Sequence, residues 1–221
     1  MKKLFLLLML TFSLFAYGSK RDDSKYLKGA VPQENGLIVF SKTFKVKGAE
    51  KNQLHHNLYR FVKEELVDKG IPNSSSRMLT EEKDPASISA KVEEWLVFTK
   101  RFLNLDQTRL RYQIDVVTKG NTVTMQVKQI SYLYEEEWDE LQPTGRGGRI
   151  IRAERWIDDE SALDKKGTKL LPQSGKFRRK TVDRVQAIFA AAMDTIEGKI
   201  QNGEMTNKNE TIKPKRQFVE E

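Results

Sequence analysis

Residues 109–134 carry an alternating pattern that constrains the fold more than any other stretch of the chain. On both sides of Gly120-Asn121, apolar side chains alternate with polar ones, which is the period of strands with one buried face. Gly120 followed by Asn121 is typical of a two-residue hairpin turn. After Gln129 the apolar positions shift by one residue, which predicts a β-bulge. Such a hairpin cannot bury its apolar face alone, so further strands and at least one covering helix are expected.

The neighbouring sequence predicts those elements. Alternation at residues 36–46 and 88–101, and a short run at 77–80, predict three more strands. Residues 51–69 and 178–200 instead repeat apolar side chains every three or four positions, which predicts two amphipathic helices. The expected fold is α+β, in the order β-α-β-β-β-β-α, with an antiparallel five-stranded sheet and both helices packed on one face. The other face of the sheet is expected to be solvated.

The N-terminus predicts export. Residues 1–18 combine Lys2 and Lys3 with an apolar run that is short for a membrane span, and with a small-residue cleavage site after Ala16 or Gly18. We therefore expect a signal peptide, and a protein of the periplasm or the extracellular space with no transmembrane segment after cleavage. The chain has no Cys, which excludes disulfides, thiol catalysis and thiolate metal sites.

The chain divides into segments by composition. Residues 19–35 are expected to form a polar leader, and 36–134 the sheet domain. An irregular insertion with a short helix is expected at 135–174, followed by a C-terminal helix at 175–202 that packs on the sheet. Residues 203–221 are polar and charged, which predicts a disordered tail.

Four segments resemble a family of exported bacterial proteins: YLKGAVPQENGLIVFSKTFKVKG at 26–48, SYLYEEE at 131–137, AERWIDD at 153–159 and GKFRRKTVDRV at 175–185. The family is catalogued as a domain of unknown function with a TATA-binding-protein-like (TBP-like) fold. This resemblance implies a curved antiparallel sheet in which the first strand lies next to the last. It implies no activity, ligand or catalytic residue, and the fold alone does not imply DNA binding.

No residue pattern predicts catalysis, a metal site or a cofactor. His55 and His56 are the only histidines, and adjacent positions on a helix point about 100° apart, so both cannot face one metal. No nucleophile-elbow motif is present. Paired carboxylates for polymer hydrolysis could be drawn from the acids at 135–139 or 158–160, but so many exposed acids select no pair.

The solvated sheet face is the first candidate binding site. Trp95, Arg111, Gln113 and Asp115 are expected to lie on it together. Trp95 could stack on a peptide or sugar while Arg111 and Asp115 orient the ligand. The alternative is an ordinary solvated face, or one covered by residues 135–175.

A basic cluster at 176–184 is the second candidate. It includes Arg178, Arg179 and Lys180 near the expected N-terminus of the second helix, where the positive end of the helix dipole disfavours cations. An anionic ligand such as a phosphate or an acidic glycan could offset that repulsion. The alternative is pairing inside the chain with the acidic run at 135–140.

Charge and composition narrow the choice of partners. The formal net charge is +8 at pH 7, which favours anionic partners, but acidic residues are interspersed with the basic ones. Nucleic acid is not an expected partner of an exported protein. We predict a non-catalytic binding or interaction module of the bacterial envelope, with a peptide, a glycan or an envelope protein as partner. The alternative is a hydrolase that acts on an envelope or dietary polymer through paired carboxylates.

Overall fold

The computed structural model describes residues 22–46, 51–72, 74–81, 87–101, 104–137 and 147–197. The predicted signal peptide at 1–18 and the predicted tail at 203–221 lie outside the described residues. Within the described part of the chain, no helix is both long enough and apolar enough to cross a membrane.

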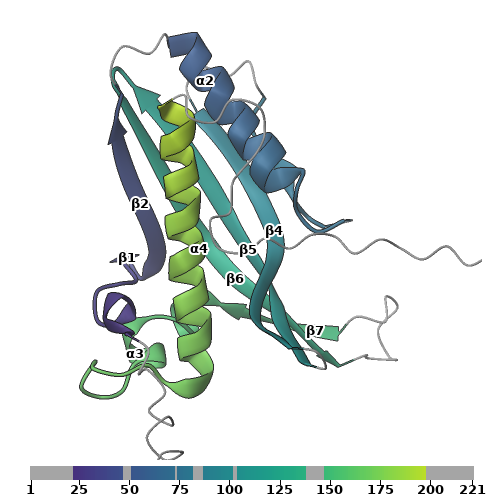
Figure 1. Ribbon diagram of the computed structural model, residues 1–221, viewed down its shortest axis with the longest axis vertical. Helices are drawn as coiled ribbons and strands as arrows, with labels where there is room; N and C mark the ends of the chain where they lie inside the picture. Colours follow the sequence, from purple (N-terminus) through teal and green to yellow (C-terminus); the bar gives the residue numbers. More distant parts are fainter. Residues whose placement is uncertain are drawn as a thin grey trace, which may run out of the picture.

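Among the described residues, the core of the fold is one antiparallel sheet of seven strands (Figure 1). Their order is β1-β2-β6-β5-β4-β3, and β7 pairs separately with β6. The strands are β1 (Gln33–Glu34), β2 (Leu37–Lys45), β3 (Arg77–Met78), β4 (Ser87–Arg101), β5 (Asn104–Lys119), β6 (Thr122–Glu137) and β7 (Gly147–Arg152). The first long strand, β2, pairs with β6, as the family resemblance implies.

The expectation of five strands is wrong. Strand β1 comes from the polar leader, and β7 comes from the segment expected to be an irregular insertion. Both strands are short and lie at the edge of the sheet, so neither shows an apolar alternation that a sequence pattern could reveal.

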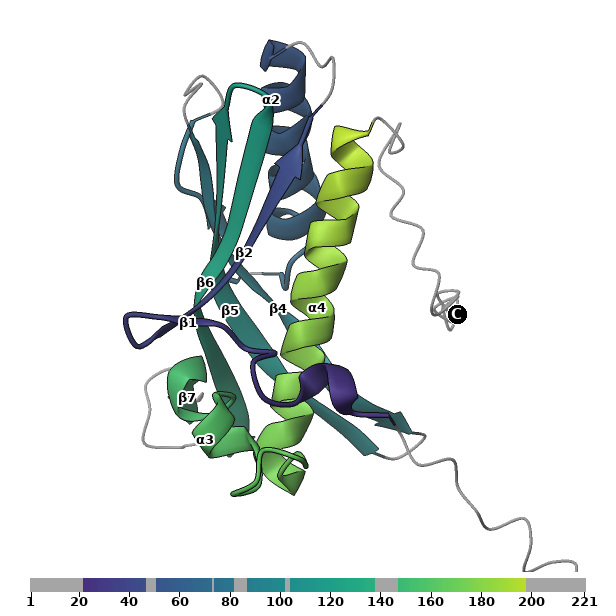
Figure 2. The same ribbon diagram turned by 90° about the vertical axis from the view of Figure 1, so that its left-hand side faces the viewer.

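Two long helices cover the same face of the sheet (Figures 1 and 2). Helix α2 (Lys51–Arg60) continues directly into a π-helical segment, η3 (Phe61–Val67). Helix α4 (Pro172–Ile196) crosses the sheet beside it. Three short elements complete the described part of the chain: η2 (Ser24–Tyr26), η4 (Ala153–Arg155) and α3 (Asp159–Ala162). The α+β class and the one-sided packing of the helices are therefore confirmed.

The predicted bulge in β6 is present at Gln129. Arg111 pairs with Ser131 and Gln113 pairs with Lys128, so two residues of β6 face one residue of β5. Gln129 takes a left-handed conformation with φ of +54°. The extra residue returns the side chains that follow it to the helix-covered face, where Tyr132 is fully buried and its hydroxyl lies 2.7 Å from Thr181 Oγ1.

A single apolar core fills the space between the sheet and the helices. Ile38, Ile114 and Met125 enter it from the sheet, and Leu58 and Ile188 from the helices. Aromatic contacts pack its lower end, where the ring of Phe177 meets Phe98, Tyr132 and Trp156 at centroid distances of 4.5, 4.9 and 5.8 Å. Tyr26 and Val31 of the leader are also buried in this core.

Candidate functional site

The sheet face turned away from α2 and α4 is named the open face. Strand alternation places Trp95 of β4 and Arg111, Gln113 and Asp115 of β5 on it, as the sequence predicts. The Trp95 side chain remains 40% exposed, although the guanidinium carbon of Arg109 lies 5.2 Å from its ring centroid. The four predicted residues thus share one surface, which none of the described helices covers.

A buried carboxylate organises the centre of the open face. Glu93 is only 1% exposed, because two arginines and a serine close around it. Its Oε1 accepts from Arg109 Nη1 at 3.0 Å, and its Oε2 accepts from Arg111 Nε at 3.1 Å and from Ser75 Oγ at 2.6 Å. Burial alone would raise the pKa of Glu93, but the hydrogen bonds from Ser75, Arg109 and Arg111 outweigh it and lower the pKa to about 2.

A second carboxylate, Asp115, lies two residues further along the same face of β5. It accepts from Ser89 Oγ at 2.6 Å and from Gln113 Nε2 at 2.9 Å, and it forms an ion pair with Lys128 of β6. Burial opposes ionisation, but Gln113, Lys128 and Ser89 together lower the pKa of Asp115. Arg111 and Asp115 are therefore held by different partners, Glu93 and Lys128.

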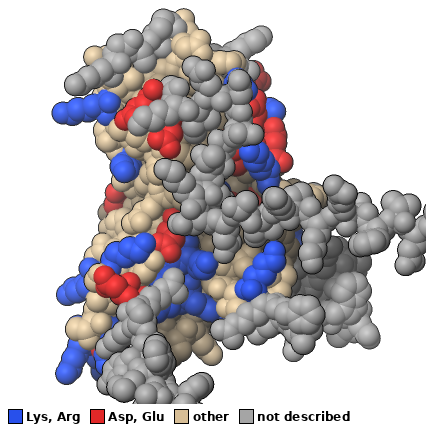
Figure 3. Space-filling view, in the orientation of Figure 1, with Lys and Arg blue, Asp and Glu red and all other residues tan. Residues whose placement is uncertain are grey.

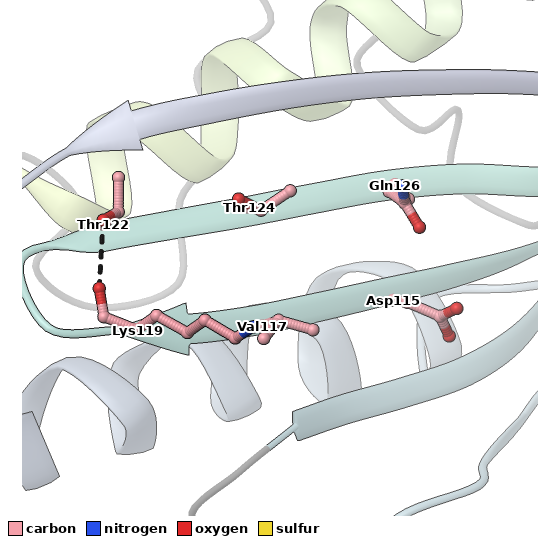
Figure 4. A pocket seen from close by; sticks show the side chains of 6 residues that line it. All are labelled: Asp115, Val117, Lys119, Thr122, Thr124 and Gln126. Atoms are coloured by element: carbon pink, nitrogen blue, oxygen red, sulfur yellow. Dashed lines mark hydrogen bonds between the residues drawn. The ribbon is translucent and has the colours of Figure 1, made fainter.

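A hollow of about 350 Å³ lies on the open face at the hairpin end of β5 and β6. It is lined by Asp115, Val117, Lys119, Thr122, Thr124 and Gln126 (Figure 4). Figure 4 shows the Lys119 side chain extended along β5 toward Val117. The lining includes hydroxyl, amide and carboxylate groups, so it can form hydrogen bonds with a polar ligand. Alternation placed Thr124 and Gln126 on this face, but nothing in the sequence indicated a hollow beside them.

The basic cluster is built differently from the prediction. Helix α4 begins at Pro172, so its cations lie in the second turn or later, beyond the first turn where the dipole repels them most. Arg178 is fully buried. Its guanidinium donates to the carbonyl oxygens of Tyr26 at 2.5 Å, Ile157 at 2.7 Å and Leu27 at 2.7 Å, and to Asp159 Oδ1 at 2.6 Å. This arginine joins the leader, the segment before α3 and the helix α4.

The neighbouring cations also have partners inside the chain. Arg179 binds both oxygens of Asp23 at 2.6 Å, Lys176 lies 2.6 Å from Asp106, and Arg184 binds both oxygens of Glu94 at 2.7 Å. Figure 3, which views the helix side, shows acidic groups between the basic ones. The side chains of the acids at 135–140, which were the partners expected from the sequence, lie outside the described residues. Among the described residues, Lys180 has no ion pair.

Two of the acids considered for a hydrolytic pair, Asp158 and Asp159, have partners within the chain. Asp158 Oδ1 caps α3 by accepting from Ser161 N at 2.7 Å, and Asp159 binds Arg178. In the described ranges there is also no group of three or more His, Asp or Glu side chains placed to hold a metal.

Comparison with known proteins gives two levels of similarity. The model of a family described as "Domain of unknown function (DUF4468) with TBP-like fold" matches residues 40–133. A crystal structure of a TBP-like protein from Parabacteroides distasonis ATCC 8503 is 17% identical, with a TM-score of 0.56 over 79% of this chain and 99% of that one. This second likeness shows the fold alone. No match was found among curated proteins.

A crystal structure of a DUF4468 family protein from Bacteroides ovatus ATCC 8483 is 34% identical to this chain, with a TM-score of 0.65. The alignment covers 78% of this chain and 95% of that one. The chain therefore belongs to the DUF4468 family, whose function is unknown and whose fold is TBP-like.

Proposed function

We propose that this protein is exported and serves as a non-catalytic binding module of the bacterial envelope, with the open face as its binding surface. The observation that carries the proposal is the exposed Trp95 on the sheet face that α2 and α4 leave open. A large aromatic side chain left 40% exposed on a polar surface is a common anchor for peptides and sugars. Gln113 and the hollow beside Asp115 add hydrogen-bonding groups on the same surface.

The charge state of the open face favours binding over hydrolysis. A glycosidase of the usual kind needs one carboxylic acid with a raised pKa to protonate the leaving group. The pKa values of Glu93 and Asp115 are both lowered, and Glu93 is closed off from solvent. Both acids therefore stay ionised and bound to protein groups, so we propose a binding role and not the hydrolase.

The binding role can be tested by titrating the exported chain with peptide and glycan libraries. We expect one class of ligand to bind, and Trp95→Ala to weaken that binding at least about tenfold through loss of the stacking surface. Leu171→Ala is the matched control, because Leu171 is 38% exposed but precedes α4 at a distance from the open face. Equal affinity of both variants for every ligand bound by the parent protein would refute the open face as the site.

Export needs its own measurement. The full-length chain is expressed in a bacterial host with an outer membrane, and the cell fractions are separated. We expect mature protein in the periplasm or the medium, with an N-terminus at Tyr17 or Ser19. Uncleaved protein confined to the cytoplasm would contradict the proposal.

A further inference from the structure

Strand register arranges a row of cations across the open face. Arg77 of β3 lies opposite Lys91 of β4, Lys91 lies opposite Gln113 of β5, and Gln113 lies opposite Lys128 of β6. Neighbouring strands are about 4.8 Å apart, so this row extends about 14 Å across the sheet.

The adjacent rows extend the same charge. The next row contains Glu93 of β4, Arg111 of β5, Ser131 of β6 and Arg152 of β7. The row after that contains Trp95 of β4 and Arg109 of β5. Successive rows on one face are separated by two residues, or about 7 Å. The basic band is defined as Arg77, Lys91, Arg109, Arg111, Lys128 and Arg152.

The described acids of the open face do not neutralise this band. Glu93 is shared by two of its arginines, and Asp115 pairs with Lys128. Arg77, Lys91 and Arg152 are exposed and have no ion pair with a described residue. The band therefore keeps a surplus of positive charge.

Sheet stability does not explain this surplus. Arg77 and Lys91 lie directly opposite each other, and like charges at directly opposed positions destabilise a sheet. An anionic partner that lies across the strands would relieve this repulsion. The charge pattern thus points to a ligand that carries several negative charges.

The groups on either side of the band indicate the chemistry of the rest of the ligand. Trp95 borders it on one side and offers an exposed ring for stacking. Ser89, Asp115 and Gln126 form the row on its other side and lead into the hydroxyl-lined hollow. Sugar rings present apolar faces to aromatic side chains and hydroxyls to such polar groups.

We propose that the open face binds an acidic glycan, a chain of sugars with carboxylate or sulfate groups, and that the basic band holds its charges while Trp95 stacks on one ring. The inference rests on the proposed binding role of the open face and adds the class of ligand. The extent of the band matches a polymer segment of a few sugars better than a single anion.

The test compares two pairs of substitutions in the exported chain. Arg77→Gln with Lys91→Gln removes two exposed charges of the band, and Lys165→Gln with Lys166→Gln removes two exposed charges between α3 and α4. The probes are polygalacturonate, dextran sulfate and neutral dextran, measured by calorimetric titration at low and high salt. The carboxylated and sulfated probes separate the two possible sources of negative charge.

We expect the parent protein to bind at least one charged probe but not dextran, with an affinity that falls as salt is added. The band variant should bind about tenfold or more weakly at low salt, and the control variant within about twofold of the parent protein. Thermal unfolding of both variants checks folding. Removing both of these opposed charges should leave the melting temperature of the band variant unchanged or higher.

Three outcomes would overturn the inference. In the first, neutral glycans or peptides bind, and their binding depends on Trp95 but not on the band. The open face then remains the binding site, but an acidic glycan is refuted as its ligand. Tighter binding of a single-stranded oligothymidylate or of phosphatidylglycerol vesicles assigns the band to another polyanion. If no probe or library member binds the open face, the proposed function fails as well.

Discussion

At the scale of single residues, Glu93 shows how strongly this sheet controls one charge. A carboxylate that is 1% exposed remains ionised because Arg109, Arg111 and Ser75 replace the water it has lost. Removing one partner of a buried ion pair lowers the free energy of unfolding by more than the pair itself contributes. The reason is that the remaining charge stays buried without compensation.

Glu93→Gln is expected to change the acid sensitivity of folding. The pKa of Glu93 is about 2 in the folded protein and near 4.5 when unfolded, so its stabilising contribution is complete above about pH 5 and is lost as pH falls toward 2. Urea unfolding should show a loss of about 2–3 kcal/mol for the variant at pH 7, and a smaller loss at pH 3. Glu34→Gln, at an exposed acid of β1, is the control. Parallel pH curves for the parent protein and Glu93→Gln would contradict this assignment.

Arg178 and Arg179 are adjacent in sequence but should differ in their effect on stability. Arg178→Ala removes the buried guanidinium that donates to three carbonyl oxygens and to Asp159, so a loss of about 3–5 kcal/mol is expected. Arg179→Ala removes a half-buried ion pair with Asp23 and should cost about 1 kcal/mol or less. Thermal and urea unfolding measure both. A similar loss of stability in the two variants would show that the burial of Arg178 does not increase its contribution to stability.

Sequence alternation could place Trp95, Arg111, Gln113 and Asp115 on one face, because strand period alone decides that. It could not reveal that Arg178 is buried. Arginine is mostly exposed in proteins, and the acceptors here come from Tyr26 and Leu27, about 150 positions earlier in the chain. The same limit applies to Glu93, whose burial depends on side chains from β5 and on Ser75.

At the scale of elements, the bulge in β6 decides which face each side chain of the second half of the strand occupies. A one-residue change of register sends every following side chain to the other face. The slip in apolar phase made this bulge visible in the sequence, because both halves of β6 are long enough to show their own alternation.

Deletion of Gln129 is therefore expected to damage the fold far more than its replacement. The deletion would turn Ile130 and Tyr132 toward the open face, and the free energy of unfolding should fall by more than about 3 kcal/mol. Gln129→Gly, which adopts the left-handed conformation without strain, should leave stability unchanged or raise it by up to about 1 kcal/mol. Urea unfolding of both variants gives the comparison. Equal stability of the deletion variant and the parent protein would show that β6 can shift its register freely.

The ends of helices and the short strands were harder to predict. The apolar repeat of α4 becomes clear only after residue 177, but Pro172 marks the first helical position and could have indicated the earlier start. Strand β7 has no such signal, because its adjacent apolar residues Ile150 and Ile151 point to opposite faces of the sheet. This segment is a strand because it pairs with β6, which the sequence pattern does not reveal.

At the scale of the whole molecule, the leader belongs to the folded unit. Tyr26 is 3% exposed and donates its hydroxyl hydrogen bond to Asp183 of α4, while β1 extends the sheet beside β2. A sheet domain starting at residue 36 would lack all of these contacts.

Removal of residues 19–35 should thus cost at least about 4 kcal/mol, from lost burial of Tyr26 and Val31 and from the missing acceptors of Arg178. Tyr26→Phe keeps the packing and should cost only about 1 kcal/mol. Urea unfolding midpoints report both changes. An unchanged midpoint for the truncated chain would show that the leader is an accessory to the fold.

The pairing of β2 with β6 has a consequence for the order of folding. Strand β2 is synthesised well before its ladder partner in β6, with which it pairs from Val39 opposite Lys128 to Lys45 opposite Thr122. Strands β4, β5 and β6 follow one another through short connections, so they can assemble by local contacts before any distant one forms. We expect β2 and α4 to dock last, which means that the two ends of the chain close the core together and an interrupted synthesis product cannot be native.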